Sequence, residues 1–289
     1  MDPISVVVLR GGVVEARHRV HAVAVRDGRI VEFAGNPHLV AHLRSSAKPF
    51  QALPLLRLRR DLTGEEIAIA CASHLARPEQ LAAVRSLLAK APAREDELEC
   101  GPEPLEHNCS GKHAGMLALC RARGWESAGY RHPDHPVQEA CLAEVAAAAQ
   151  VPAAEIRSGV DGCGVPTFAL PLERMAHAFA RLPLLDGGPR AVAAMSSHPD
   201  LIRGPLAGDS MLMRALPGWW AKGGAEGLLC AGSPDRLGLA LKVEDGDTRA
   251  VRPALAAFLA RLGHRVPELG VVHVENSWGE IVGELTAAG

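Results

Sequence analysis

Segments with the pattern of β-strands lie near the two ends of the chain, and a long helical stretch separates them. Val20–Arg26 alternates apolar and polar residues, Asp27-Gly28 is a hairpin-turn signal, and Arg29–Ala34 continues as a second strand. Further strands are predicted at residues 4–10, 237–243 and 279–285. We therefore predict a mixed α/β (α+β) fold, in which an antiparallel sheet built from the N- and C-terminal segments packs with the helical middle region.

The middle of the chain carries helical periodicity and helix-boundary signals. Thr63 followed by Glu66 is a capping-box pattern, and Gly124 suits the end of a helix. Helices are predicted at about residues 50–60, 78–90, 114–123, 137–149, 171–182, 189–196 and 252–262. We expect a single two-lobed domain over residues 1–289, with a sheet lobe at about 1–43 and 225–289 and a helical lobe at about 44–224.

Composition narrows the class of protein. The chain has 289 residues, 48% of them hydrophobic, and a formal net charge of −2. This charge gives no reason to expect nucleic acid or an anionic membrane as a partner, and no apolar run is long enough to span a bilayer. Residues 1–4 lack the basic and apolar regions of a signal peptide, so we expect a cytoplasmic protein. In that compartment the 7 cysteines favour thiols or metal ligands over a disulfide framework.

The stretch 44–51 contains a serine three residues before a lysine, Ser45 and Lys48. This spacing can place a hydroxyl and an amine on one helical face, where a neutral amine takes the hydroxyl proton and creates a nucleophile. Chance alone predicts about 0.2 such pairs in this chain, so the spacing by itself is a weak signal. The alternative is that Ser45 only caps the helix. Because Pro49 fits only a first helical turn, we expect Lys48 at the helix start, with its amine turned back toward Ser45.

Lysine is scarce in this chain, which makes each lysine informative. Only five of the 31 basic residues are lysines, and three of them lie in stretches that combine nucleophiles, thiols or glycines. Arginine stays charged in proteins, whereas a buried lysine can become neutral and take part in chemistry. The alternative is codon bias that leaves a few lysines at random positions. The four stretches are 44–51, 71–74, 108–113 together with 161–164, and 221–227.

Each stretch also has a structural explanation. Ser73 can cap a turn, Lys222 can be a surface lysine in a loop, and Cys109 and Cys163 can be small buried hydrophobic residues. Together, however, the two cysteines and one nitrogen form a plausible donor set for Zn²⁺. From metal chemistry alone the nitrogen would come from His113 rather than from Lys112, because imidazole is the commoner donor.

Six short motifs, in this order, resemble the asparaginase II family, the third class of L-asparaginases. They are Ser-Ser-Ala-Lys-Pro-Phe-Gln, Cys-Ala-Ser-His, Asn-Cys-Ser-Gly-Lys-His, Asp-Gly-Cys-Gly-Val-Pro, Ser-His-Pro and Ala-Lys-Gly-Gly-Ala-Glu-Gly, and the resemblance runs from about residue 5 to 285. It implies a fold similar to serine β-lactamases and glutaminases, and a homodimer. Residues 203–210 fit the glycine-rich loop of the family only loosely.

The resemblance also implies roles for individual residues. Ser45 with Lys48 corresponds to one Ser–Lys tandem, and Ser73 with Lys222 to a second. The zinc site of the family corresponds to Cys109, Lys112 and Cys163, which overrides the preference for His113 as the nitrogen ligand. Substrate-binding positions correspond to Arg44, His113, Asp161 and Gly162.

The expected activity is hydrolysis of L-asparagine to L-aspartate and ammonia through an acyl-enzyme on Ser45. Zinc would position the substrate, since Ser–Lys chemistry needs no metal. The nearest alternative is a glutaminase or a β-lactamase-type serine acyl hydrolase. An alternative of another class is a non-catalytic zinc or thiol sensor, in which the serines are caps and the lysines incidental.

Overall fold

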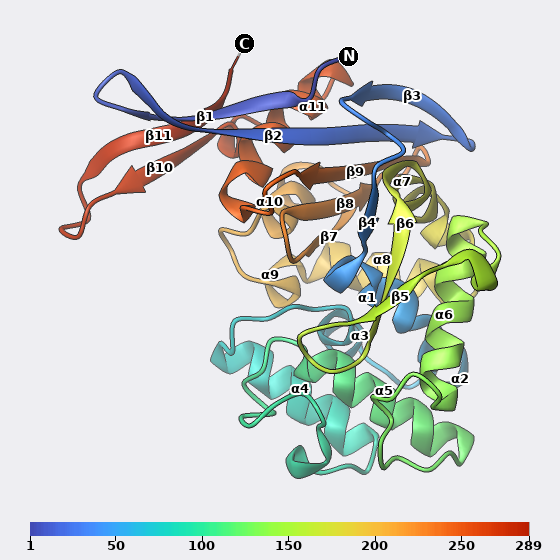
Figure 1. The fold of residues 1–289 in the computed structure, drawn as a ribbon. Coiled ribbons are helices and arrows are strands. Elements are labelled where there is room, and N and C mark those ends of the chain that lie inside the picture. The colour runs from blue at the N-terminus through green and yellow to red at the C-terminus, as the bar shows by residue number, and fades with distance from the viewer. Residues whose placement is uncertain (289) are drawn as a thin grey trace.

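The computed structural model describes residues 1–288, in which the two ends of the chain share one antiparallel sheet (Figure 1). The strand order is β10-β11-β1-β2-β9-β8-β7, and β3 pairs with β2. The strands are β1 (Ile4–Arg10), β2 (Val13–Arg26), β3 (Arg29–Ala34), β7 (Trp220–Gly224), β8 (Leu228–Gly232), β9 (Leu237–Val243), β10 (Val271–Glu275) and β11 (Ile281–Ala287). Val8 of β1 lies opposite Leu285 of β11, so the predicted pairing of the two chain ends is confirmed.

The β2–β3 hairpin forms where the sequence predicts it. Asp27 and Gly28 connect the two strands with φ angles of 49° and 77°, so both adopt the left-handed conformation. Two successive residues of this kind make the tight turn whose twist suits a hairpin. The Asp-Gly signal is confirmed.

The helices are concentrated in the middle of the chain, as predicted. They are α1 (Lys48–Gln51), α2 (Leu53–Leu58), α3 (Gly64–Ala70), α4 (Pro78–Lys90), α5 (Ser110–Arg123), α6 (Pro136–Ala149), α7 (Leu172–Arg181), α8 (Gly188–Ser197), α9 (Pro199–Ile202), α10 (Gly208–Ala215) and α11 (Val251–Arg261). Helix α7 packs on β2, β8 and β9, while α11 packs on β1, β9 and β11. The α+β architecture is confirmed. None of the helices in residues 1–288 combines the length and apolar character that a bilayer crossing needs.

A second, small sheet connects the main sheet to the helical region. It has the order β4-β6-β5, formed by β4 (Val40–His42), β6 (Pro166–Pro171) and β5 (Ser158–Val160). The turn between β5 and β6 contains Asp161, Gly162 and Cys163. The small sheet therefore brings this predicted stretch toward the start of α1, which follows β4 directly (Figure 1).

The structural explanation of Lys222 as a surface lysine in a loop is wrong, because the residue is buried in a strand. Residues 220–224 form β7, the edge strand of the main sheet, and Lys222 pairs with Cys230 of β8. Strands β7, β8 and β10 were not predicted, because none of them shows a clear alternation of apolar and polar residues. Strands β7 and β8 contain several small residues, and β10 is short. The division into two lobes stays a prediction, although β7 places residues 220–224 in the sheet rather than in the helical part.

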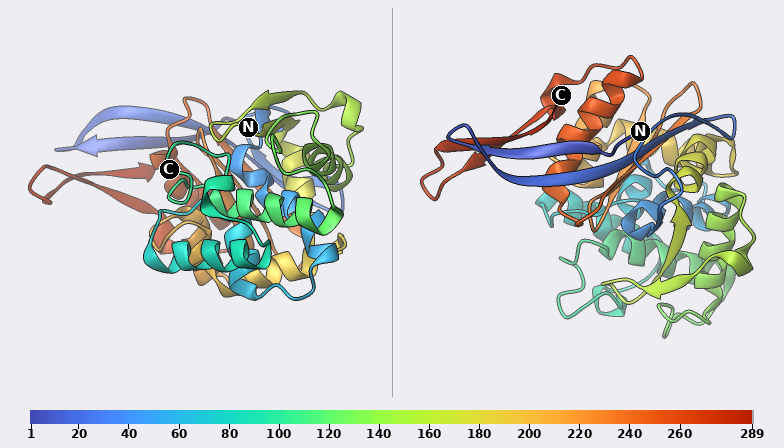
Figure 2. Two further views of the ribbon diagram at one scale, coloured as in Figure 1. Left: turned by 90° about the horizontal axis from the view of Figure 1, so that it is seen from below. Right: turned by 45° about the horizontal axis from the view of Figure 1, so that its top comes forward.

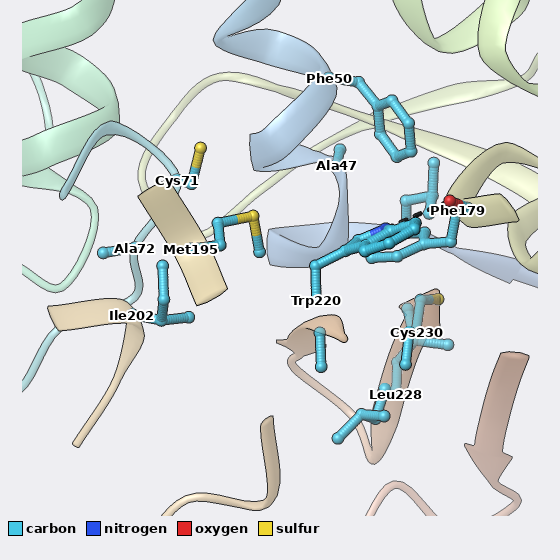
Figure 3. Close-up of a cluster of buried hydrophobic side chains, with 14 of the residues drawn as sticks. Ala47, Phe50, Cys71, Ala72, Phe179, Met195, Ile202, Trp220, Leu228 and Cys230 are labelled. Carbon is cyan, nitrogen blue, oxygen red and sulfur yellow. Dashed lines mark hydrogen bonds between the residues drawn. The ribbon is translucent and has the colours of Figure 1, made fainter. Parts of the chain in front are cut away.

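A cluster of buried apolar side chains fills the space between β7, β8 and the first helices (Figure 3). Trp220 is 1% exposed, and its indole N–H donates to the carbonyl of Phe179 at 3.2 Å. Phe179 meets Phe50 edge to face, with ring centroids 5.3 Å apart. The labelled side chains include Ala47, which directly precedes Lys48, and Cys71 and Ala72, the two residues before Ser73. This packing removes water from the region where the predicted catalytic residues meet.

Candidate active site

The start of the first helical segment carries Ser45 and Lys48. Arg44–Ala47 form a 3₁₀ turn that continues into α1. Leu43 is the N-cap, and its N–H donates to the carbonyl of Phe168 at 2.8 Å. The alternative that Ser45 is the N-cap is therefore wrong, because the cap that is bonded to the small sheet lies two residues before Ser45. Lys48 is the first residue of α1, as predicted.

The amine of Lys48 contacts Ser73 instead of turning back to Ser45. Lys48 is 1% exposed, and its Nζ lies 2.9 Å from Ser73 Oγ and 2.5 Å from the carbonyl oxygen of Ala72. The half-buried Ser45 hydroxyl makes no hydrogen bond within residues 1–288. Burial lowers the pKa of Lys48, which favours the neutral amine that a proton acceptor needs. The structure thus joins one member of each predicted Ser–Lys tandem.

Lys222 is the second buried amine. Its side chain is fully buried, and Nζ donates to the carbonyl of Gly223 at 2.7 Å. Burial lowers the pKa of Lys222 to about 7, although the carboxylate of Asp209 opposes this shift. The Ser46 hydroxyl donates to the Lys222 carbonyl at 2.8 Å and so ties the 3₁₀ turn to β7. No hydrogen bond joins Lys222 to Ser73 within the described chain.

Asp209 is a residue of this site that sequence reasoning missed. It is 1% exposed, and its Oδ2 accepts the N–H of Gly223 at 2.8 Å and lies 3.7 Å from Lys222 Nζ. Its Oδ1 accepts the N–H of Ser210 at 3.0 Å. Asp209 belongs to the 203–210 segment that departs from the family pattern, and an aspartate in a helix first turn gives no functional signal. Only the packing of α10 on β7 brings the carboxylate to the amine.

Two predicted substrate-binding residues pair with each other. Arg44 Nε and Nη2 each lie 2.9 Å from Asp161 Oδ1, and this oxygen also accepts the N–H of Gly162 at 2.7 Å. Both side chains are largely buried, with 24% exposure for Arg44 and 13% for Asp161. The backbone of Arg44 has a φ of 47°, a left-handed conformation that residues other than glycine rarely adopt. Such local strain is common where a side chain must be aimed at a ligand.

The three predicted zinc ligands gather between α5 and the β5–β6 turn. Lys112 Nζ lies 2.9 Å from Cys163 Sγ, and Cys109, Lys112 and Cys163 are each at most 5% exposed. Cys163 and the neighbouring amines lower the pKa of the Cys109 thiol well below its ordinary value, whereas the hydrogen bond to Cys109 raises the pKa of Cys163. Burial would lower the pKa of Lys112, but the two thiols raise it. The raised pKa values leave protons on Cys163 and Lys112, and a binding zinc ion would have to displace them. Two sulfurs and one nitrogen are then donor types that zinc accepts.

Other metal arrangements are not found. Within residues 1–288, no group of three or more His, Cys, Asp and Glu side chains is placed to hold a metal ion. The predicted set falls outside that definition, because its third donor is a lysine.

His113 lies next to Lys112 on α5 and is fully buried. Its Nδ1 is 2.7 Å from the hydroxyl of Tyr130, and its Nε2 has no partner in residues 1–288. Burial lowers the pKa of His113 well below its ordinary value, so the ring stays neutral. The predicted site residues thus lie in the 3₁₀ turn and α1, in the segment after α3, at the N-terminal end of α5, in the β5–β6 turn and on β7.

Comparison with known proteins gives one extended match. The profile of the L-asparaginase II family matches residues 6–287. A search of curated proteins found no significant match.

Several solved structures share a distant likeness. Mglu in its native form is 16% identical, with 86% of this chain and 65% of that chain covered and a TM-score of 0.38. EstCE1, a hydrolase with promiscuous acyltransferase activity, is 10% identical, with 77% and 87% covered and a TM-score of 0.42. A β-lactamase from Desulfarculus baarsii is 17% identical, with 78% and 82% covered and a TM-score of 0.37. The chain spans about two thirds of the length of Mglu, and at these TM-scores the likeness carries no argument.

Proposed function

The chain belongs to the L-asparaginase II family, and we propose that it is an amidohydrolase that converts L-asparagine to L-aspartate and ammonia. The observation that carries this proposal is the pair of buried lysines, Lys48 and Lys222, whose pKa values are lowered by burial. A neutral amine beside a serine can accept its proton, which is the requirement for a serine nucleophile without a histidine. The contact between Lys48 Nζ and Ser73 Oγ supports this chemistry.

In the proposed reaction, Ser45 Oγ attacks the side-chain carboxamide carbon of asparagine. The Ser45 proton passes to neutral Lys48, and Ser73 passes a proton to the departing nitrogen, so that the C–N bond breaks and ammonia leaves. Water then hydrolyses the ester on Ser45 and releases aspartate. Lys48 and Ser73 come from the two different Ser–Lys tandems. Their hydrogen bond supports a single path along which the proton moves from Ser45 through Lys48 to Ser73.

Arg44 and Asp161 are suited to the charged end of the substrate. The two side chains now pair with each other. An amino-acid substrate can replace this ion pair, with its α-carboxylate bound to the Arg44 guanidinium and its α-ammonium bound to the Asp161 carboxylate. Gly162 offers a backbone N–H in the same turn.

Ser45→Ala is expected to lower asparagine turnover at least about a thousandfold, because the reaction loses its nucleophile. An ammonia-release assay on asparagine, glutamine and a penicillin measures both the loss and the substrate class. Mass spectrometry of a trapped acyl-enzyme should place the adduct on the peptide containing Ser45. Near-normal turnover of Ser45→Ala, or an adduct on Ser73, would show that the nucleophile is misassigned. Preference for glutamine or a penicillin would reject asparagine as the substrate.

We further propose that Cys109, Lys112 and Cys163 hold a zinc ion. A bound zinc ion would supply a fixed positive charge that orients the substrate, without taking part in the Ser–Lys proton transfers. Elemental analysis of the purified protein should find zinc in the wild type and much less in Cys109→Ser and Lys112→Met. Chelation should raise the KM for asparagine more than it lowers kcat. Equal zinc content in all three proteins contradicts this assignment.

A further inference from the structure

Tyr130 is the only tyrosine of the chain, and it is fully buried against His113. The two rings meet edge to face, with centroids 5.5 Å apart and an interplanar angle of 66°. Gln138 of α6 donates to the Tyr130 carbonyl at 2.8 Å, and Glu99 Oε1 accepts the N–H of Gly129 at 2.7 Å. These contacts hold the backbone on both sides of the ring, so that the hydroxyl has a fixed position.

The roles of the Tyr130 hydroxyl in its hydrogen bonds follow from what its two partners can donate and accept. Its oxygen has two partners in residues 1–288: the N–H of Glu99 at 2.9 Å and Nδ1 of His113 at 2.7 Å. A backbone N–H can only donate, so the single hydroxyl hydrogen is left for His113 Nδ1. If Nδ1 carried the hydrogen instead, the buried hydroxyl would have no acceptor, and leaving such a donor unpaired is costly. Burial raises the pKa of Tyr130, so the hydroxyl keeps this hydrogen.

The hydrogen of the neutral His113 ring therefore lies on Nε2. That atom is buried and has no hydrogen-bond partner within residues 1–288. Buried donors without an acceptor are rare in folded proteins, and one beside the predicted zinc and substrate residues points to an acceptor that arrives with a ligand. A groove of ≈ 590 Å³ lies nearby, and its walls include Gly129, the residue before Tyr130, and Gly162 and Cys163 of the β5–β6 turn.

We propose that Tyr130 is a positioning residue that sets the tautomer of His113, so that Nε2–H donates to an oxygen of the substrate and His113 supplies no ligand to zinc. The part of this proposal that concerns the substrate rests on the proposed function. The oxygen that accepts from His113 Nε2–H belongs to a carboxylate or carboxamide group of the substrate. The same hydrogen-bond assignment explains why His113 does not bind zinc. Nδ1 uses its lone pair to accept the Tyr130 hydroxyl, and Nε2 carries the hydrogen, so neither ring nitrogen has a free lone pair. This assignment agrees with Lys112, and not His113, as the nitrogen donor beside Cys109 and Cys163.

Nuclear magnetic resonance of ¹⁵N-histidine-labelled protein tests the tautomer directly, because a protonated and an unprotonated ring nitrogen have distinct shifts. The His113 signals are identified by their loss in His113→Asn. The wild type should show Nε2 protonated and Nδ1 unprotonated, both without zinc and with zinc added. Tyr130→Phe, which keeps the ring but lacks the hydroxyl, should lose this single tautomer. A wild-type ring with hydrogen on Nδ1, or with a nitrogen bound to added zinc, overturns the proposal even if Tyr130→Phe fails to fold.

Steady-state kinetics test separately whether His113 Nε2–H donates a hydrogen bond to the substrate. Tyr130→Phe and His113→Asn should each lower kcat/KM for asparagine about tenfold, the usual effect of losing one hydrogen bond. His113→Gln should recover part of this loss, because its side-chain amide nitrogen reaches the position of Nε2. Equal losses in His113→Gln and His113→Asn would overturn the donor role. A wild type without asparaginase activity but with the expected tautomer would reject the proposed function and leave the tautomer assignment standing.

Discussion

Two lysines are kept in apolar surroundings, and this is the residue-level basis of the site. Apolar neighbours of Lys48 and Lys222, among them Ala47, Ala72 and Trp220, form the cluster in Figure 3. Removal of water disfavours the ammonium form of a lysine, so both pKa values fall. An arginine at either position would stay charged and could not accept a proton.

The pH dependence of activity should reflect Lys222. The resemblance pairs Lys222 with Ser73, and only a neutral amine can accept a serine proton. Because burial lowers the pKa of Lys222 to about 7, kcat/KM should fall as the pH drops through about 7. Asp209→Asn removes the charge that raises this pKa, so the acid limb should move to lower pH. The asparagine side chain can still accept the N–H of Gly223, which keeps the local fold.

A pH–rate profile of wild type and Asp209→Asn measures this shift. Asp235→Asn is the matched control, because Asp235 pairs with Arg26 at an exposed site away from Lys222. An acid limb at the same pH in all three proteins would mean that Lys222 does not titrate in the reaction.

At the level of elements, α7 lies against β9 closely enough to require glycine there. A Cβ at Gly238 would stand 1.8 Å from the carbonyl oxygen of Ala176 in α7. Helix α7 also carries Phe179, which accepts the indole N–H of Trp220 on β7. The close approach of α7 to the sheet therefore helps to fix the strand that carries Lys222.

Gly238→Ala is expected to lower the free energy of unfolding by about 1–3 kcal/mol, because α7 must move away from β9. Gly115→Ala is the matched control: its Cβ would lie 3.4 Å from Ala70 Cβ, an ordinary contact, and alanine favours the helix. Chemical denaturation measures both. Similar stabilities for the two variants would show that the α7–β9 contact is not tight.

For the whole molecule, two hairpins extend beyond the helical part (Figures 1 and 2). The β1–β2 and β10–β11 hairpins pair side by side through β1 and β11. They expose large apolar side chains, with Val13 at 66%, Trp278 at 85% and Ile281 at 62%. Apolar side chains gathered on one projection are typical of an interaction surface, and the predicted homodimer would use them.

Light scattering after size-exclusion chromatography should give a mass of about 61 kDa, twice the 30.5 kDa of one chain. Trp278→Asp with Ile281→Asp should shift the protein toward monomer, since a charge would be buried in the interface. Leu184→Asp, at an apolar position with 60% exposure after α7, should leave the mass unchanged. A monomeric wild type contradicts the dimer prediction.

The sequence alone determined the features that depend on near neighbours. The Asp27-Gly28 turn, the Thr63–Glu66 capping box and the position of Lys48 at the start of α1 follow from a few adjacent residues, and the structure has all three. Ordered motifs also indicated the family and the chemically active residue types. The glycine-rich β7 escaped prediction because its extended form comes from pairing with β8 rather than from its own side chains.

Only the tertiary structure decided which of these residues meet. Lys48 contacts Ser73 rather than Ser45, Asp209 lies beside Lys222, and the Tyr130 hydroxyl binds His113. Each contact joins segments from different elements, and their approach depends on how helices and strands pack rather than on local periodicity. The lowered pKa values of the lysines have the same origin. Burial is a property of the assembled core, so the sequence can supply a lysine, but packing alone makes it a neutral one.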